Sequence, residues 1–194
     1  EYGGKWKLFH YMAKRFYAPT VLSAFQTQQD QLEVWLTNDA LEARQYRATL
    51  RVLDFGGVEK QRLDFSGQVE AGSALKLDER AVQTLAPRTE AVFALLDLEI
   101  DGKSTRNLHF FAPYKACELL SGGVSTAVDD LGEGRFAVEV AATAPAFFIS
   151  LNADGIRGEF DDNCIALLGG ETRRLVFVAK GEAPSAEAFA EALS

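Results

Sequence analysis

The first segment of the chain carries aromatic and small apolar residues at spacings of three and four. This spacing places them on one face of a helix with about 3.6 residues per turn. Pro19 disfavours helical geometry at Ala18, so the helix is expected to end there. A helix of about 15 residues is marginal alone in water, so its apolar face must pack on a partner. The residues of this face are Trp6, Phe9, His10, Ala13, Phe16 and Tyr17.

From Thr20 onward the hydrophobic positions recur at every second residue. Short runs rich in β-branched, aromatic and aliphatic residues are separated by turn signals such as Gly56-Gly57 and Asp101-Gly102. Seven short strands within residues 20–112 are typical of an immunoglobulin-like sandwich. We predict these strands at 20–26, 31–37, 46–55, 58–65, 74–77, 91–100 and 105–111.

A second β-rich region, residues 113–182, follows an interruption of the pattern at Ala112-Pro113. It predicts a second, smaller sandwich. Residues 183–194 predict a short amphipathic helix, because Ser185 can cap it and Phe189 lies four residues before Leu193. The strands of the second sandwich are predicted at 115–120, 124–128, 135–141, 146–151, 158–165 and 172–179.

The expected fold class is therefore mostly β. Two consecutive immunoglobulin-like β-sandwiches are preceded by one N-terminal α-helix in residues 1–19 and followed by a short C-terminal helix. The helix is basic and both sandwiches are acidic, so we expect the helix to belong to a different unit. Because the chain begins with Glu1, we also expect it to be a piece of a longer protein.

Composition and charge restrict the partners of the chain. Of its 194 residues, 47% are hydrophobic and 25% are charged, as in folded globular proteins. The net charge of −8 is opposite to the basic surface that nucleic acids require. The longest apolar runs are far shorter than the roughly 20 residues that span a bilayer. We expect no nucleic-acid partner, no membrane partner and no cofactor.

The two histidines and two cysteines have ordinary structural interpretations. His10 could be a general base, but its helix face offers no nucleophile or carboxylate at a helical spacing, which favours packing or capping. His109 lies inside a predicted strand, and packing is favoured there too. Cys117 and Cys164 both fall in the predicted second sandwich. They could form a bridge between its sheets, but two buried free thiols are favoured.

Two acidic stretches are similar to fragments of calcium loops. Asp129-Asp130 and Asp161-Asp162-Asn163 lack the spaced ligands of an EF-hand, so solvated turns are favoured for both. A retaining glycosidase needs two carboxyl groups about 5 Å apart, and a sandwich face offers no concave mouth to hold them. We predict no catalytic, cofactor-binding or metal-binding residue in this chain.

Trp35 has an unusual place in the predicted first sandwich. Leu32, Val34 and Leu36 face one side of their strand, while Glu33 and Trp35 face the other. Either both sheet faces are covered or Trp35 seals a contact between domains. An exposed Trp35 is also the most plausible stacking platform for a sugar ring in the two sandwiches.

Three motifs resemble the β-mannosidases of glycoside hydrolase family 2. Residues 4–19, GKWKLFHYMAKRFYAP, are similar to W-K-x-L-H-Y-x-x-K-R-F-F/Y-A-P, which closes the catalytic barrel of that family. Residues 32–39 match its L-x-V-W-V/L-x-N-D strand and turn. Residues 158–171 are similar to F-S-D-N-F/Y-F-D-L-x-P-G-E in its last immunoglobulin-like domain. The departures in the last motif are Asp161, Cys164, Ala166 and Gly169, where the family has Ser, an aromatic residue, Asp and Pro.

The resemblance implies the end of a catalytic barrel followed by two accessory domains. Its parent would release terminal β-mannose with retention, using two glutamates that precede this segment. The leading hypothesis is therefore a non-catalytic region that braces the missing barrel through the aromatic helix face and meets β-mannosides only through the parent enzyme. The alternatives are a carbohydrate-binding sandwich that uses Trp35, or an adhesive immunoglobulin-like module.

Overall fold

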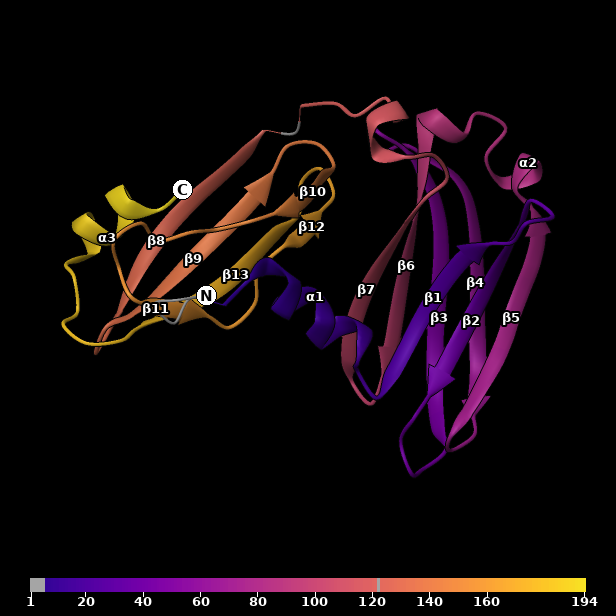
Figure 1. Cartoon of the computed structure of the whole chain (residues 1–194), viewed down its shortest axis with the longest axis horizontal. Helices are drawn as coiled ribbons and strands as arrows, with labels where there is room; N and C mark the ends of the chain where they lie inside the picture. The colour runs from indigo at the N-terminus through magenta and orange to yellow at the C-terminus, as the bar shows by residue number, and fades with distance from the viewer. Residues whose placement is uncertain (1–5, 122) are drawn as a thin grey trace. The chain divides into compact units, whose positions relative to one another are not determined.

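The computed structural model describes residues 6–121 and 123–194 (Figure 1). Residues 4 and 5 of the first motif lie outside this part. The chain forms two compact units. The first unit is Phe16–Leu120, and the second joins the N-terminal segment that ends at Arg15 to Ser121–Ser194. The division at Ser121 lies later than the sequence boundary at 112–113. No helix of the described residues is long and apolar enough to cross a membrane.

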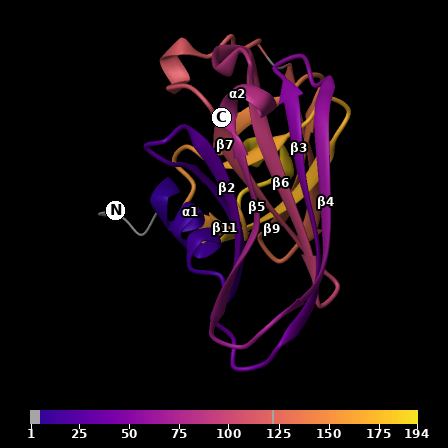
Figure 2. The same ribbon diagram turned by 90° about the vertical axis from the view of Figure 1, so that its right-hand side faces the viewer.

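The first unit is a sandwich of a three-stranded and a four-stranded antiparallel sheet, which stack face to face (Figures 1 and 2). The three-stranded sheet has the order β1-β2-β5 and the other has the order β4-β3-β6-β7. The strands are β1 (Thr20–Gln26), β2 (Gln31–Asn38), β3 (Arg44–Asp54), β4 (Glu59–Val69), β5 (Ser73–Ala81), β6 (Val92–Ile100) and β7 (Lys103–Phe110). The short helices are α2 (Val82–Leu85), η1 (Thr89–Ala91) and η2 (Tyr114–Ala116).

Alternating burial explains why these residues form strands. Every second residue of β2 is buried, and Leu36 pairs with Leu22 of β1 across the sheet. Leu50 of β3 pairs with Leu96 of β6 in the facing sheet, and both are fully buried. All seven predicted strands are present. The strand that exceeds its predicted length most is β5, which is predicted at 74–77. Its backbone pairing with β2 continues through polar residues whose sequence shows no alternation of apolar and polar positions.

The second unit has a four-stranded sheet with the order β11-β13-β9-β8 and a two-stranded sheet, β10-β12. Two helices complete it, since Tyr11 of α1 and Phe189 of α3 belong to its core. The expected helix–sandwich–sandwich–helix fold class is confirmed. The elements are α1 (Leu8–Phe16), β8 (Val124–Gly132), β9 (Arg135–Ala142), β10 (Ala146–Ile149), β11 (Gly158–Phe160), β12 (Ile165–Leu167), β13 (Thr172–Ala179) and α3 (Ala186–Ala192).

The predicted strand at 115–120 is wrong. This segment contains the single turn η2 and irregular backbone, and the N–H of Glu118 donates to the carbonyl oxygen of Glu90 in the first unit. Cys117 therefore lies in the first unit and not in the second sandwich. Both cysteines are free thiols, with Cys117 half-buried and Cys164 buried.

The predicted strand at 158–165 is interrupted. It divides into β11 and β12, separated by a loop at residues 161–164. The loop ends at Cys164, whose φ of +54° is a left-handed conformation that a continuous strand cannot contain.

Candidate functional site

Helix α1 is anchored to the second unit by the face that carries Tyr11. The Tyr11 side chain is only 4% exposed, and its hydroxyl donates to the carbonyl oxygen of Phe160 at 3.3 Å. Burial raises the pKa of the Tyr11 phenol, so the group remains a neutral donor at neutral pH. This contact joins the helix to the end of β11.

Arg15 lies on the same face of α1 and binds the loop between β11 and β12. Its Nη1 donates to the carbonyl oxygen of Cys164 at 3.0 Å. Its Nη2 donates to the carbonyl oxygen of Asn163 at 2.7 Å and to Oδ1 of Asp162 at 2.6 Å. Nη2 of Arg173 binds Oδ2 of the same carboxylate at 2.7 Å. The planar guanidinium can make several bonds in fixed directions, which a lysine ammonium cannot reproduce.

These contacts correct the expectation that a basic helix and acidic sandwiches belong to different units. The opposite charges pair, since Arg15 of the helix and Asp162 of the sandwich form an ion pair, with side chains 32% and 21% exposed. The charge contrast is therefore a sign of complementarity between the helix and the second sandwich.

The loop is held by Asn163, which corrects the expectation of a solvated turn at this position. Asn163 is 4% exposed, and its Oδ1 accepts from the backbone N–H groups of Leu151 and Cys164. Its Nδ2 donates to the carbonyl oxygen of Leu151 at 2.7 Å. The buried amide replaces backbone pairing where β11 and β12 separate. Within the described ranges, no group of three or more His, Cys, Asp or Glu residues could hold a metal ion.

The predicted docking face of α1 is open to solvent. Phe9 is 67% exposed and Tyr17 is 85% exposed, and Trp6 and Phe16 are about half exposed. His10 is exposed as well, and its ring lies edge-on to the ring of Trp6 with 3.5 Å between their centres. Ala13, the last of the six predicted residues, is half-buried. Exposed apolar surface of this extent is typical of an interaction site.

Sequence reasoning missed the opposite face, where Tyr11 and Arg15 bind the second unit. The available signal was their spacing of four, which places them on one helix face. The sequence does not reveal that their partners lie almost 150 positions away, as the Arg15 contacts show.

The two histidines lie in different units. Nε2 of His109 is 3.1 Å from Oε1 of Gln26, and the His109 ring lies edge-on to Phe111. Burial lowers the pKa of His109, so its imidazole is neutral at neutral pH. These neighbours agree with the packing role that the sequence favours for His109.

Trp35 lies on the outer face of the three-stranded sheet. Its Nε1 donates to Oε2 of Glu33 at 2.7 Å. Nζ of Lys76 binds the other oxygen of Glu33 at 2.9 Å and lies 5.3 Å from the centre of the Trp35 ring. The hydrogen bond from Lys76 lowers the pKa of Glu33, so this carboxylate is an ionised acceptor. The indole is therefore held in one orientation on the sheet.

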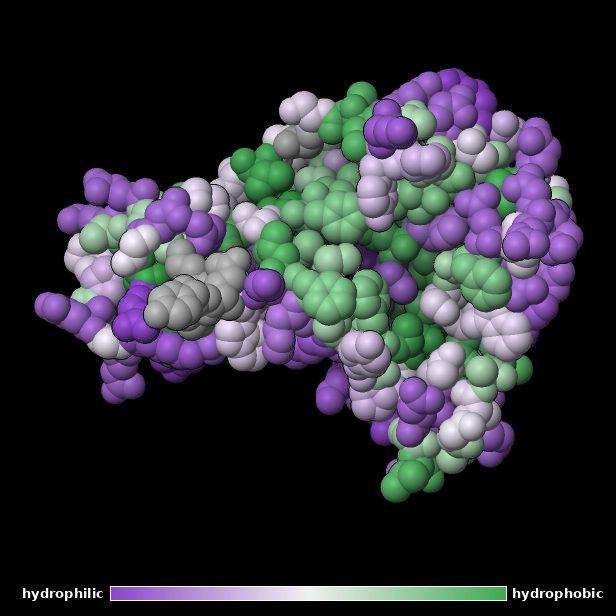
Figure 3. Space-filling view, viewed as in Figure 1, coloured by the Kyte–Doolittle hydropathy of each residue, from purple (hydrophilic) through white to green (hydrophobic). Residues whose placement is uncertain are grey.

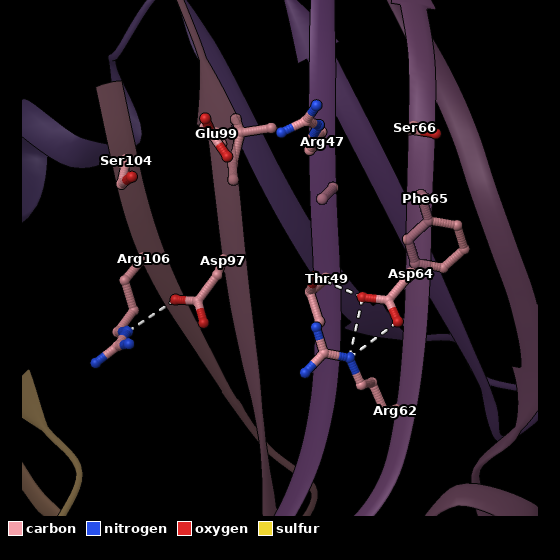
Figure 4. Close-up of a pocket in the computed structure, with 12 residues that line it drawn as sticks. Arg47, Thr49, Arg62, Asp64, Phe65, Ser66, Asp97, Glu99, Ser104 and Arg106 are labelled. Atoms are coloured by element: carbon pink, nitrogen blue, oxygen red, sulfur yellow. Dashed lines mark hydrogen bonds and ion pairs between the residues drawn. The ribbon is translucent and has the colours of Figure 1, made fainter. Parts of the chain in front are cut away.

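The outer face of the four-stranded sheet forms an open polar trough of about 640 Å³ (Figure 4). Oxygens of Asp97 accept from Arg51 at 2.7 Å and from Arg106 at 2.8 Å. Both oxygens of Asp64 accept from Arg62 (Figure 4). The hydrogen bond from Arg62 lowers the pKa of Asp64. A carboxyl group with this shift is unsuited to act as a general acid. These charged groups of the trough are therefore paired with one another, arginine with aspartate.

Two family descriptions match the chain in sequence. The description "Mannosidase Ig/CBM-like domain" matches residues 30–116, and "Ig-fold domain" of the mannosidase type matches residues 120–194. β-Mannosidase from Capra hircus is 30% identical over 187 residues, and β-mannosidase A from Emericella nidulans is 27% identical over 198 residues. These alignments cover 91% and 92% of this chain. The chain spans only 21% of the length of either relative.

Solved structures show the same fold. The β-D-mannosidase of Dictyoglomus thermophilum matches 97% of this chain with a TM-score of 0.79 and 19% identity, over 22% of its own length. The exo-chitosanase CsxA of Amycolatopsis orientalis matches 87% of this chain with a TM-score of 0.62 and 20% identity, over 24% of its own length. At these identities the two structures establish the fold alone. Together with the sequence matches, they confirm the resemblance: the chain carries the tandem immunoglobulin-like domains of the β-mannosidase family.

Proposed function

We propose that this chain is the non-catalytic C-terminal part of a β-mannosidase-like glycoside hydrolase and that it braces the catalytic barrel of its parent. The observation that carries the proposal is the two-sided character of α1. One face is bound to the second unit through Tyr11 and Arg15, while the other leaves Phe9 in solvent, and Tyr17 directly after the helix is exposed as well. Covering such apolar area stabilises a complex by about 25 cal/mol per Å².

The length of the relatives favours a barrel as the occupant of this face. The chain spans 21% of the two β-mannosidases compared above, so their catalytic machinery has ample room outside the matched region. Cleavage of terminal β-mannosides with retention is the activity that we propose for the parent. The chain would contact the substrate only through that parent.

The anchored face gives the bracing role a physical basis. Arg15 holds three acceptors of one loop, and Tyr11 holds the neighbouring strand end. The orientation of α1 on the second unit is thus fixed before α1 binds the barrel. Fixing a binding element in advance reduces the conformational entropy lost on association.

An assay with an aryl β-mannoside tests the non-catalytic part of the proposal. The 194-residue chain is expected to show no turnover above the buffer rate. Turnover comparable to that of an intact β-mannosidase would overturn this part.

Substitutions in the full-length parent test the bracing part. Phe9→Asp and Tyr17→Asp introduce charges into the proposed contact, so we expect a lower melting temperature and a loss of activity in the parent. The control is Leu41→Asp, since Leu41 is 96% exposed in the loop between β2 and β3. A parent that tolerates Phe9→Asp and Tyr17→Asp as well as the control substitution would contradict the bracing role.

A further inference from the structure

We propose that the free edge of β4 binds β4 of a second copy of this chain in antiparallel orientation, so that two four-stranded sheets join into one. β4 is the end strand of the sheet β4-β3-β6-β7 (Figure 2). Leu63 lies on the two-fold axis of the proposed pair. This surface belongs to the first unit and contains no residue of α1. The proposal therefore goes beyond the bracing of a barrel and can fail separately from it.

The backbone of β4 has one neighbouring strand. Within residues 6–121 and 123–194, β4 pairs with β3 alone, and no backbone hydrogen bond from another segment reaches residues 59–69. In an antiparallel ladder, the N–H and C=O groups of successive residues point alternately to the two sides of the strand. β4 therefore presents backbone donors and acceptors along its outer edge, which can pair with a further strand.

The other edges of the first unit are less suited to such pairing. The ladder of β5 with β2 contains a bulge, and β5 places the charged residues Asp78 and Arg80 opposite core residues of β2. Inward-facing charges and bulges discourage pairing at an edge. On the other side of the sandwich, Nδ2 of Asn107 in β7 donates to the carbonyl oxygen of Leu22 in β1 at 3.2 Å. β4 instead keeps an unbroken register with β3 from Gln61 to Val69.

The charges of β4 select one register for the second copy. A two-fold axis perpendicular to the sheet keeps each side chain on its own face, so the axis passes through a residue. With the axis at Leu63, Arg62 lies opposite Asp64 of the second copy, and symmetry repeats this pair. An axis at Arg62 or at Asp64 would place two like charges directly opposite each other, which is destabilising.

The side chains at the centre of this register are accessible. Arg62 is 51% exposed and Asp64 is 60% exposed, and within one copy they are joined through Nε of the arginine at 2.9 Å. The remaining N–H groups of the guanidinium can donate to Asp64 of the second copy. On the inner face, Leu63 and Phe65 are half-buried and pack against the core of the first unit. A second strand beside them would cover more of their apolar surface.

A second copy fits this edge because its charges complement themselves. A two-fold contact uses the same surface on both partners, so it requires this self-complementarity. Figure 3 shows hydrophilic residues along much of the margin beside β5, which follows β4 through the turn at Gly72. The contact therefore depends on backbone bonds and charge pairs. A single strand edge buries less area than a stable interface, so we expect a dissociation constant on the order of 100 µM.

Analytical ultracentrifugation of the 194-residue chain tests the association. Between about 10 µM and 1 mM, the weight-average mass should rise from 21.2 kDa toward twice this value. Arg62→Asp places like charges opposite each other at two positions and should weaken the association about tenfold. Exchanging the two residues, Arg62→Asp with Asp64→Arg, restores the opposite charges and should restore the affinity.

Two control variants change the charge elsewhere. Arg80→Asp makes the same charge change on β5, where Arg80 binds Asp78 as Arg62 binds Asp64. Phe9→Asp alters the exposed face of α1. Both variants should associate as the unchanged chain does. Thermal unfolding of every variant verifies that the chain is folded.

Disulfide cross-linking tests the register. In a Cys117→Ser background, Leu63→Cys should form a covalent dimer with oxidised glutathione, because residues on the axis have Cα atoms about 4.5–5.5 Å apart. Ser66→Cys is the control on the same strand. Its two copies would be separated by six residues of extended chain, about 20 Å, which is too far for a disulfide.

A chain that stays monomeric at about 1 mM would overturn the proposal and would leave the bracing role of α1 untouched. Association that Arg62→Asp does not weaken, or that the exchanged pair does not restore, would overturn it too. The same holds if Arg80→Asp or Phe9→Asp abolishes association in a folded chain, or if Ser66→Cys cross-links as readily as Leu63→Cys.

Discussion

The two units of this chain build their cores in different ways. The first unit fills its core mainly from the strands of two sheets, one of three and one of four strands, with α2 contributing Val82 and Leu85. The second unit places a four-stranded sheet against a sheet of only two short strands. Tyr11 and Phe189, from helices near opposite ends of the chain, enter its core. A narrow sheet cannot cover a wide one, so the second unit depends on its helices.

The largest expected effect is the loss of the α3 anchor. Phe189 is fully buried and stacks on Phe136 with 4.3 Å between ring centres, with Phe177 at 4.9 Å. Phe189→Ala should cost the second unit about 3–5 kcal/mol, because a large cavity replaces the ring. Urea unfolding followed by amide NMR signals assigned to each unit measures the loss.

If Phe189→Ala destabilises both units equally, the claim that only the second unit depends on α3 is wrong. We expect the signals of the first unit to keep their midpoint, since Phe189 belongs to the second core. Leu41→Ala is the matched control in the first unit, because Leu41 is 96% exposed and its removal leaves no cavity.

The next effect concerns the attachment of α1. Arg15→Ala removes three hydrogen bonds to the loop at residues 162–164 and should destabilise the docked helix by about 2 kcal/mol. Arg15→Lys should recover only part of this, because an ammonium cannot reach all three acceptors. Hydrogen exchange of the α1 amides, compared with those of β9, measures the difference.

Lys14→Ala is the control for this attachment. Lys14 makes one exposed bond of 3.4 Å to the carbonyl oxygen of Asp161, so its removal should change exchange little. Equal acceleration of exchange in the Lys14 and Arg15 variants would show that α1 is held by general charge and not by the guanidinium contacts.

The same contrast explains what the sequence could predict. In the first unit, the alternating period and the turn residues predict all seven strands, and β1 is found at the predicted residues 20–26. Hairpin neighbours are close in sequence, so local patterns carry the necessary information. The motif resemblance also identifies the β-mannosidase family, whose two domain descriptions match the chain.

The second unit shows where local patterns fail. The bonds from Arg15 to Asn163 and Cys164 join residues far apart, and no periodicity encodes such a pairing. The left-handed φ of Cys164 interrupts an apolar run that otherwise resembles one strand. At the end of the first unit, residues 115–120 have strand-like composition, but a hydrogen bond from Glu118 to Glu90 holds them in an irregular path. Tertiary contacts override propensity in all three cases.

The stability of the first unit is expected to depend on pH through His109, which the second unit does not contain. Burial lowers the pKa of His109 in the folded state below its ordinary value of 6.5. As the pH falls, His109 therefore binds a proton at a higher pH in the unfolded chain than in the folded one. The stability that neutral His109 supplies should be complete above pH 6.5 and should decrease as the pH falls below this value. Urea midpoints of the first unit between pH 7.5 and about 5 measure the decrease.

His109→Gln is the matched variant for the titration. Glutamine can retain a polar contact with Gln26 and does not titrate, so the variant should show a flatter pH profile in the first unit. An unchanged slope below pH 6.5 would assign the pH dependence to other groups.

The smallest effects come from two turn glycines, one in each unit. Gly72 has φ of +58° and Gly155 has φ of +75°, and an added Cβ would meet no atom within 4 Å at either position. Alanine therefore adds only the cost of a left-handed backbone, about 1–2 kcal/mol, partly offset by about 0.4–1 kcal/mol of lost freedom in the unfolded chain. Urea unfolding should show losses of at most about 1.6 kcal/mol in both variants.

The ratio of the two decreases in unfolding free energy shows how strongly the helices restrict the backbone of the second unit. Gly155 follows Ala153, which forms a β-bridge with Leu193 just after α3, whereas the turn of Gly72 has no helix beside it in the hydrogen-bond pattern of the described residues. If both turns can relax, the losses are equal and asparagine in place of alanine reduces both, because it tolerates this conformation. A loss several times larger at Gly155 would mean that the bridge to Leu193 prevents relaxation, and the dependence of the second unit on α3 would then extend from its core to its surface turns.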